Sequence, residues 1–218
     1  METLTRDITD TDDDIGVILG RLTSAAVSLV KGVDYADVML VQDGSFESVA
    51  PTDPLVTELD AVQMQSGDGP CLEAAVDTSI IRCDDVENDP RWPTFTAAAL
   101  SFGVRATMSY QLYTNLGGAG ALNLFSRRSH AVDSEGEAIG AVLATHAATA
   151  IMAVNTRQQF QSALASRDLI GQAKGILMNR FAIDAVRAFE LIVKQSQDVN
   201  IPVREIAQKI IDVYGGKR

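Results

Sequence analysis

Three cationic side chains lie close together near the end of the sequence, at Arg167, Lys174 and Arg180. Guanidinium and ammonium groups bind phosphate oxygens, so such a group of cations suits a polyanionic partner. The same segment contains Gly171 and Gly175, and a glycine inside a helix costs roughly 1 kcal/mol relative to alanine. We therefore expect another backbone, a helix or a ligand to come close at these glycines. The alternative is that the cations only solvate helix faces.

Three helices are predicted to position these cations, because apolar residues recur at spacings of three and four. Asp184 should cap the second helix, Asn200-Ile201-Pro202 should start the third, and Gly215-Gly216 should end it. A unit of about fifty residues barely buries a core alone, so it would gain from docking or dimerising. The predicted apolar faces comprise Ile170, Ala173, Leu177 and Phe181; Ala185, Ala188, Phe189, Ile192 and Val193; and Val203, Ile206, Ala207, Ile210 and Ile211.

A spaced set of residues in this segment resembles the ANTAR domain over about residues 160 to 214. The resemblance implies a three-helix domain that binds paired RNA hairpins, prevents terminator formation and acts as a dimer under a sensory domain. The set consists of Arg167, Ile170, Ala173-Lys174-Gly175, Met178, Ala185, Leu191, Ser196, Asn200 and Glu205-Ile206-Ala207. The RNA-binding residues expected on this basis are Arg167, Lys174, Arg180, Lys194, Arg204 and Lys209, with Gln172, Asn179 and Gln195 available to contact unpaired loop bases. Met178 belongs either to the core or to the RNA-binding face.

The charge distribution agrees with a polyanion-binding C-terminal part. Residues 155 to 218 hold ten Lys/Arg and six Asp/Glu, a net charge of +4. The whole chain has a net charge of −11, so residues 1 to 154 carry −15. The asymmetry is more informative than the acidic total. A charge of +4 gives a modest electrostatic footprint for nucleic acid, and a dimer would double it.

The first two thirds of the chain predict an α+β domain built on antiparallel strands. Helices are expected at 13–31, 70–76 and 94–102, and residues 53–65 are expected to be helical or mixed. Strands are expected at 35–42, 46–50, from Ile80, at 106–113 and at 119–125. Turns are expected at Asp43-Gly44 and at residues 115–118, and a loop at residues 84–93. Asp133 should cap a helix that either continues to Phe181 or breaks near residues 155–166.

Several short motifs of this part resemble the GAF domain over about residues 15 to 154. They are Gly67-Asp68-Gly69-Pro70-Cys71 with Glu73-Ala74, Asp89-Pro90-Arg91-Trp92-Pro93 with Phe95, Gly103-Val104-Arg105, and residues 118–123. The resemblance implies a small-molecule sensor and dimerisation module of the actinobacterial type, without the motifs for cyclic nucleotides or a bilin. Candidate ligand-binding residues are Cys71, Trp92, Phe95 and Arg105. The alternatives are buried structural thiols at Cys71 and Cys83, aromatic packing, and a salt bridge at Arg105.

No catalytic residue, metal site or cofactor is predicted, so we do not expect an enzyme. The sequence lacks a nucleophile elbow, a P-loop and Cys or His at metal-ligand spacing. It also shows no signal-peptide pattern and no apolar run of about twenty residues, which predicts a cytoplasmic protein.

The combined prediction is a homodimeric, signal-responsive RNA-binding regulator of transcription antitermination. Its expected parts are a flexible acidic N-terminus (1–12), a GAF-like sensor (13–154), a helical connector (155–165) and an ANTAR domain (166–218). The helices near residues 133–155 and 14–31 should build the dimer through an alanine-rich face at Ala144, Ala147, Ala148, Ala150 and Ala153. The alternatives are a helical protein-interaction module and a DNA-binding regulator.

Overall fold

The N-terminal unit is built on an antiparallel sheet of five strands, counted over the described part of the chain, in the order β2-β1-β5-β4-β3. The strands are β1 (Tyr35–Gln42), β2 (Ser45–Val49), β3 (Ile80–Cys83), β4 (Ala106–Tyr113) and β5 (Ala119–Ser126). The computed structural model describes all residues except 1, 43–44, 77–79, 114–118 and 216–218, and the turns predicted at 43–44 and 115–118 lie largely outside it. The predicted α+β class is confirmed.

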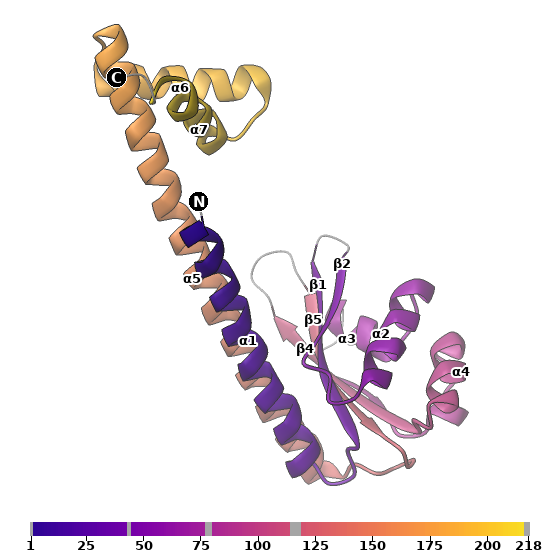
Figure 1. Ribbon diagram of the computed structural model, residues 1–218. Coiled ribbons are helices and arrows are strands. Elements are labelled where there is room, and N and C mark those ends of the chain that lie inside the picture. Colours follow the sequence, from indigo (N-terminus) through magenta and orange to yellow (C-terminus); the bar gives the residue numbers. More distant parts are fainter. Residues whose placement is uncertain (1, 43–44, 77–79, 114–118, 216–218) are drawn as a thin grey trace. The chain divides into compact units, whose positions relative to one another are not determined.

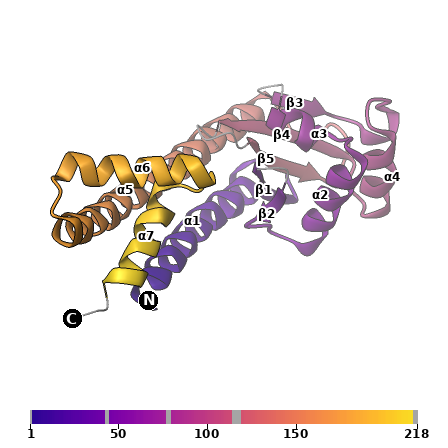
Figure 2. The same ribbon diagram turned by 90° about the horizontal axis from the view of Figure 1, so that it is seen from above.

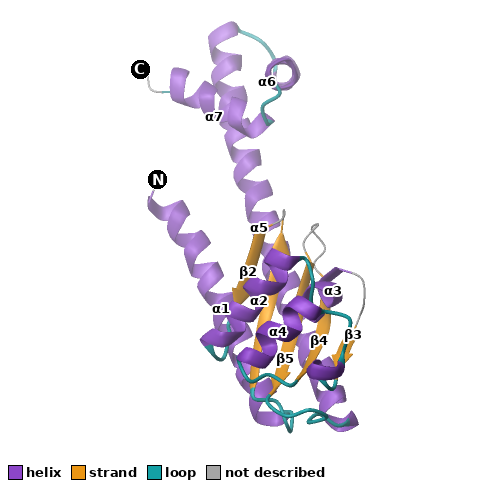
Figure 3. Cartoon of the chain, turned by 90° about the vertical axis from the view of Figure 1, so that its right-hand side faces the viewer, coloured by secondary structure: helices purple, strands orange, loops and turns teal. Residues whose placement is uncertain are grey.

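Helices cover both faces of this sheet (Figures 1 and 3). One face carries α1 (Glu2–Leu29) and the first half of α5 (Ser134–Phe181). The other carries α2 (Pro54–Ser66), α3 (Pro70–Val76) and α4 (Pro93–Ser101), with the short 3₁₀ helix η1 (Val86–Asn88) before α4. Because successive strand residues point to opposite faces, β1 places Val38 against α1 and α5 and Met39 against α2 and α3.

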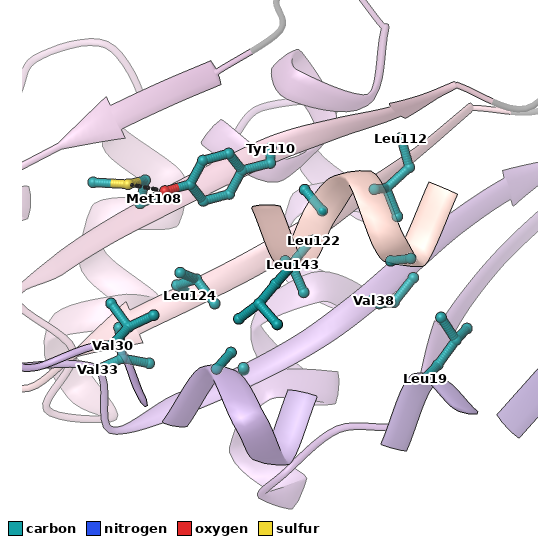
Figure 4. Packing of buried hydrophobic residues seen from close by; sticks show 14 of the residues in the cluster. Leu19, Val30, Val33, Val38, Met108, Tyr110, Leu112, Leu122, Leu124 and Leu143 are labelled. Atoms are coloured by element: carbon teal, nitrogen blue, oxygen red, sulfur yellow. Dashed lines mark hydrogen bonds between the residues drawn. The ribbon is translucent and has the colours of Figure 1, made fainter. Parts of the chain in front are cut away.

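The long helix α5 packs closely on the sheet through Gly140 (Figure 4 shows the neighbouring core). Tyr110 of β4 is buried, and its hydroxyl donates to the Glu137 carbonyl oxygen at 2.8 Å. A Cβ atom on Gly140 would collide with the Tyr110 hydroxyl and ring. Glycine is therefore needed at this position in spite of its low helix propensity.

Gly140→Ala is expected to destabilise the N-terminal unit by about 1–3 kcal/mol, because an added methyl group overpacks the contact with Tyr110. Urea denaturation followed by circular dichroism would measure the change. Gly171→Ala is the matched control, since no atom of the described chain lies within 4 Å of its added Cβ, and it should gain about 1 kcal/mol. Equal effects at the two positions would contradict the packing argument.

The C-terminal unit comprises residues 155–218 and contains the end of α5 with α6 (Ala185–Val199) and α7 (Val203–Tyr214). In Figure 2, α6 and α7 lie beside the last turns of α5. Asp184 caps α6 by accepting from the Arg187 N–H at 2.8 Å, as predicted. Asn200 ends α6 in the left-handed region at φ 52°, and α7 begins after Pro202. The buried core consists of Ala173, Leu177, Ala188, Ile192, Ile206 and Ala207.

Two sequence-based expectations about the helices need correction, and one open alternative is decided. α1 begins at Glu2, so the start predicted near residue 13 is too late. α5 continues to Phe181 without a break through residues 155–166, which is the first of the two alternatives left open by the sequence. A stretch of α5 is also apolar enough to cross a membrane by length and composition, with a mean hydropathy of 1.5, where no such run was expected. Leu143, Ala147 and Ile151 of this helix are buried in the sheet's core, which accounts for part of that apolar content.

Candidate functional site

The six cations predicted to contact RNA all lie in the C-terminal unit. Arg167, Lys174 and Arg180 are on α5, Lys194 is on α6, and Arg204 and Lys209 are on α7. Lys174 is half-buried and the others are exposed. Within the described residues none of the six forms a salt bridge, whereas Arg187 pairs with Glu190 at 2.9 Å. Their charges therefore remain available for an anionic partner.

Arg180 and Lys209 lie beside an apolar groove of about 470 Å³ that α5, α6 and α7 form together. Leu177, Ile192 and Ile206 are buried at this groove, and Phe181, Val213 and Tyr214 line it with exposed side chains. Phe181 lines the groove together with Leu177 of the same predicted apolar face, but its side chain is 55% exposed. Arg204 instead lines a separate hollow with Ser162, Ser166 and Leu169. The six cations thus do not converge on a single cavity.

Two cations of this unit lie over exposed aromatic rings. The Arg180 guanidinium is 4.5 Å from the centre of the Tyr214 ring, and the Lys174 ammonium is 5.9 Å from the Phe189 ring. Phe189, a member of the predicted apolar side of α6, is 43% exposed. Cation–aromatic contacts at exposed sites contribute about 0.5–1 kcal/mol, so they orient these side chains at the surface.

Gly171 and Gly175 have no neighbour in the described chain that would meet an added Cβ atom within 4 Å. The close approach predicted at these glycines is therefore not made by the rest of this protomer. Met178, one turn further along α5, is 37% exposed, so it does not belong to the buried core.

The sheet face under α2 and α3 carries a buried row of polar side chains. Asp37, Asn123 and Ser109 are cross-strand neighbours on β1, β5 and β4, and all three are fully buried. Asn123 Nδ2 donates to Asp37 Oδ1 at 3.0 Å, and Ser48 Oγ donates to Asp37 Oδ2 at 2.8 Å. The row is therefore held in place by direct hydrogen bonds.

Helix α2 adds two buried polar residues to this row. Gln63 Nε2 donates to Asp60 Oδ1 at 3.2 Å, and the Cys71 backbone N–H donates to Gln63 Oε1 at 2.9 Å. Gly69, at φ 154°, lies so close to Gln63 that a side chain there would collide with the amide. Two residues of the Gly67–Cys71 motif therefore hold the Gln63 side chain in place: Gly69 packs against it, and the Cys71 N–H binds its amide oxygen.

Electrostatics at this cluster disfavour negative charge. Burial raises the pKa of the Asp37 carboxyl, and burial together with the charge of Asp37 raises the pKa of Asp60 well above the ordinary 3.8. Burial, followed by the two carboxylates, also raises the pKa of the Cys71 thiol. Burial and the proximity of two like charges both oppose ionisation of the two carboxyls at the same time. The cluster is suited to proton binding, and the Cys71 thiol stays protonated.

Asp60→Asn is expected to flatten the pH dependence of stability. A carboxyl whose native pKa is raised binds its proton more tightly in the folded state, so stability falls as pH rises from about 3.8 through the raised value. The slope is at most about 1.4 kcal/mol per pH unit for one proton. Urea unfolding at several pH values measures it. Glu58→Gln, at an exposed position on the same helix, should keep the wild-type slope, and a wild-type slope in Asp60→Asn would contradict the assignment.

The four candidate ligand-binding residues do not meet in one cavity of the described structure. Cys71, Trp92 and Phe95 are buried in the core between the sheet and α2–α4, and the Trp92 indole Nε1 donates to the Glu73 carboxylate at 3.0 Å. Arg105 forms a salt bridge with Glu87 at 3.1 Å. Cys83 is buried as well, and burial followed by its contact with Asp89 raises its pKa to about 12. These contacts agree with the packing alternatives.

The buried polar cluster was not foreseen. Asp37, Asp60 and Asn123 are far apart in sequence, and a lone carboxylate usually signals a surface position. One signal was present: Asp37 lies between Tyr35 and Met39 at the period of two that places all three on one strand face. Because Asp37 shares a strand face with two large apolar residues, this alternation predicts that its carboxyl points into the core.

Comparison with known protein families finds a match for each of the two parts of the chain. The sequence profile of the GAF domain family matches residues 12–152, and that of the ANTAR domain matches residues 158–211. No curated protein matches the chain.

Solved structures resemble the N-terminal unit in fold. A GAF domain of Synechocystis in its photoproduct state has a TM-score of 0.55 at 13% identity, covering 67% of this chain and 99% of its own. A domain described as part of a two-component sensor histidine kinase from Sinorhizobium meliloti has a TM-score of 0.51 at 15% identity. The match covers 66% of this chain and 94% of that domain. The free methionine-R-sulfoxide reductase of Neisseria meningitidis has a TM-score of 0.51 at 16% identity. The match covers 68% of this chain and 86% of the reductase. Such identities establish the fold alone.

A GAF sensory domain followed by an ANTAR domain is the architecture of a signal-responsive regulator, and it is atypical of enzymes. The GAF profile covers well over half of the sequence, and the sheet with its flanking helices has the corresponding fold. The chain therefore belongs to the GAF domain family and carries an ANTAR domain at its C-terminal end.

Proposed function

We propose that this protein binds hairpin RNA through its ANTAR domain and promotes transcription through a terminator in response to a signal. The observation that carries the proposal is the set of unpaired cations on α5, α6 and α7 within the segment that matches the ANTAR profile. Phosphate binding by these groups would give affinity, and unpaired loop bases would give sequence selectivity. The protein acts by binding and catalyses no reaction.

The proposed division of labour follows the two units. Residues 13–154 form the sensor, 155–165 the connector and 166–218 the RNA-binding domain, in a cytoplasmic protein. The sensor takes a small molecule or serves in dimerisation. α7 begins with Pro202 and Val203, which offer no hydrogen bonds to base edges, so recognition of a DNA major groove by the start of this helix is disfavoured.

The direct test is to purify the full-length protein from cells and sequence the RNA that accompanies it. Enrichment of transcripts with paired hairpins upstream of terminators is expected, and a reporter carrying such a leader should show more read-through when the protein is present. Recovery of DNA or of no specific nucleic acid would contradict the proposal. Retention of a partner protein in place of RNA would favour the interaction-module alternative.

A homodimer through α1 and the first half of α5 is part of this proposal. Ala144 and Ala147, two members of the predicted alanine face, are buried within the unit, so they are not the contact surface. Val17, Ile18 and Val142 are exposed large apolar residues of the same two helices. Their exposure favours a helical bundle between two copies.

Ile18→Glu with Val142→Glu is expected to convert the dimer into a monomer, because four charged groups would enter an apolar interface. Multi-angle light scattering at micromolar concentration measures the mass. Val186→Glu, an exposed apolar position in α6, should remain dimeric. A wild-type protein that is monomeric under these conditions and still binds RNA would refute the dimer.

A further inference from the structure

We infer that the apolar groove between α5, α6 and α7 receives an unpaired base from an RNA loop, stacked on Phe181 and Tyr214. This inference rests on the proposed RNA-binding function and assigns a residue-level role that the cations alone do not supply. The groove measures about 470 Å³, within the roughly 300–1,000 Å³ of small-molecule sites. It therefore has room for a nucleobase.

The groove offers two aromatic rings to a ligand. Phe181 is the last residue of α5 and Tyr214 the last of α7, and both line the groove with side chains at least one third exposed. Aromatic rings at the surface provide stacking platforms, and every base has a π-face that can occupy one. Core packing does not account for such exposure.

The charge around the groove matches a nucleotide. Lys209 lines it and the Arg180 guanidinium covers the Tyr214 ring at 4.5 Å, while none of its described lining residues is acidic. Gln195 adds an amide that can donate to or accept from a base edge. A base would enter the apolar part while its phosphate meets the cations at the rim.

An apolar peptide or a second copy of the chain would use the same apolar surface, but neither needs the cations at its rim. The combination of stacked aromatic, cation and uncharged amide is typical of single-stranded RNA recognition. Stacking contributes in a nearly salt-independent manner, whereas phosphate contacts depend steeply on salt. The two contributions can therefore be separated experimentally.

The test uses the full-length protein and a pool of two-hairpin RNAs with randomised loops, from which the tightest binder becomes the probe. Phe181→Ala and Tyr214→Ala should each weaken binding by about 5- to 150-fold, the effect of losing one base–aromatic stack. The salt slope of Phe181→Ala should stay at the wild-type value, because no cation among the described residues is held against this ring. Lys209→Gln should instead lower the slope by roughly 0.7–0.9. Phe160→Ala, an exposed aromatic of α5 outside the groove lining, is the matched control and should bind within about 2-fold of wild type.

A second readout follows the base itself. With 2-aminopurine in the probe's loop, fluorescence should fall on binding to wild type and remain high with Phe181→Ala. A probe whose stems are retained but whose loop bases are abasic should bind the two proteins equally. Circular dichroism and light scattering on each variant would report any loss of helix or of dimer that mimics these effects.

The outcomes separate this inference from the function on which it rests. Failure of the wild-type protein to select any RNA would overturn both. Selection of RNA with unchanged affinity and unchanged fluorescence in Phe181→Ala and Tyr214→Ala would overturn only the groove assignment. A change of oligomeric state in these variants, with RNA contacts unaffected, would assign the groove to a protein partner.

Discussion

Reversal of two charges on α5, Lys174→Glu with Arg180→Glu, should nearly abolish RNA binding while leaving the fold intact. Each lost phosphate contact lowers the salt slope by about 0.7–0.9, so two contacts account for roughly 15- to 30-fold in affinity per protomer at 0.15 M salt. Repulsion by the new carboxylates adds to that loss. Fluorescence anisotropy over a salt series on the co-purified RNA would measure affinity and slope together.

The matched control is Arg187→Glu. Arg187 is exposed like Arg180, but its charge is already paired with Glu190. This substitution should change RNA affinity by only a few fold. If the doubly reversed protein bound as tightly as wild type, the surface around Lys174 and Arg180 would not be the RNA-binding face. Arg204, with the separate hollow between α5 and α7, would become the next candidate.

An insertion of two residues near Ala163 should disrupt the coupling between sensor and RNA-binding domain far more than an insertion of four. α5 is helical through this position, and each helical residue adds about 100° of rotation. Two residues therefore turn the following segment by roughly 200°, and four by only about 40°. Loss of simultaneous binding by the two protomers would reduce RNA affinity by about 100-fold or more.

RNA titrations of the two insertion proteins against wild type would measure this difference. The four-residue protein controls for the added length, and an isolated segment 155–218, if it proves stable, would define the affinity without a sensor. Equal, wild-type affinity in both insertions would show that the domains are merely tethered. Once a sensor ligand is known, a coupling of 1–3 kcal/mol would appear as a 5- to 150-fold ligand-dependent change.

Local signals in the sequence were reliable where one residue fixes the backbone. Asp184 predicted the start of α6, and Pro70 and Pro202 predicted where α3 and α7 begin. A proline or a capping carboxylate acts within its own turn of helix, so no distant contact can override it. The alternating strands of the sheet were recognisable for a similar reason, since their period of two is set by the pleat.

The features that the sequence leaves undecided are those that depend on distant neighbours. Phe181 and Phe189 have helical spacing from core residues, but the period of a helix cannot tell whether the covered arc reaches them. The same limit applies to the pairing of Asp37 with Asp60, which requires α2 to lie over β1. The groove at Phe181 and Tyr214 likewise exists only because the ends of α5 and α7 meet. No pattern within either helix encodes that meeting.

The chain's two cysteines make the protein a ready-made background for site-specific labelling. Both thiols are buried, and burial raises the pKa of each. A maleimide reacts with thiolate, which is present at a few per cent for an ordinary cysteine at neutral pH and far less for these two. A single cysteine introduced at an exposed position outside the proposed dimer interface, such as Phe160, would be modified selectively, without first deleting the native ones. Spin labels placed there in a dimer would give the separation of the two α5 helices directly, with and without RNA.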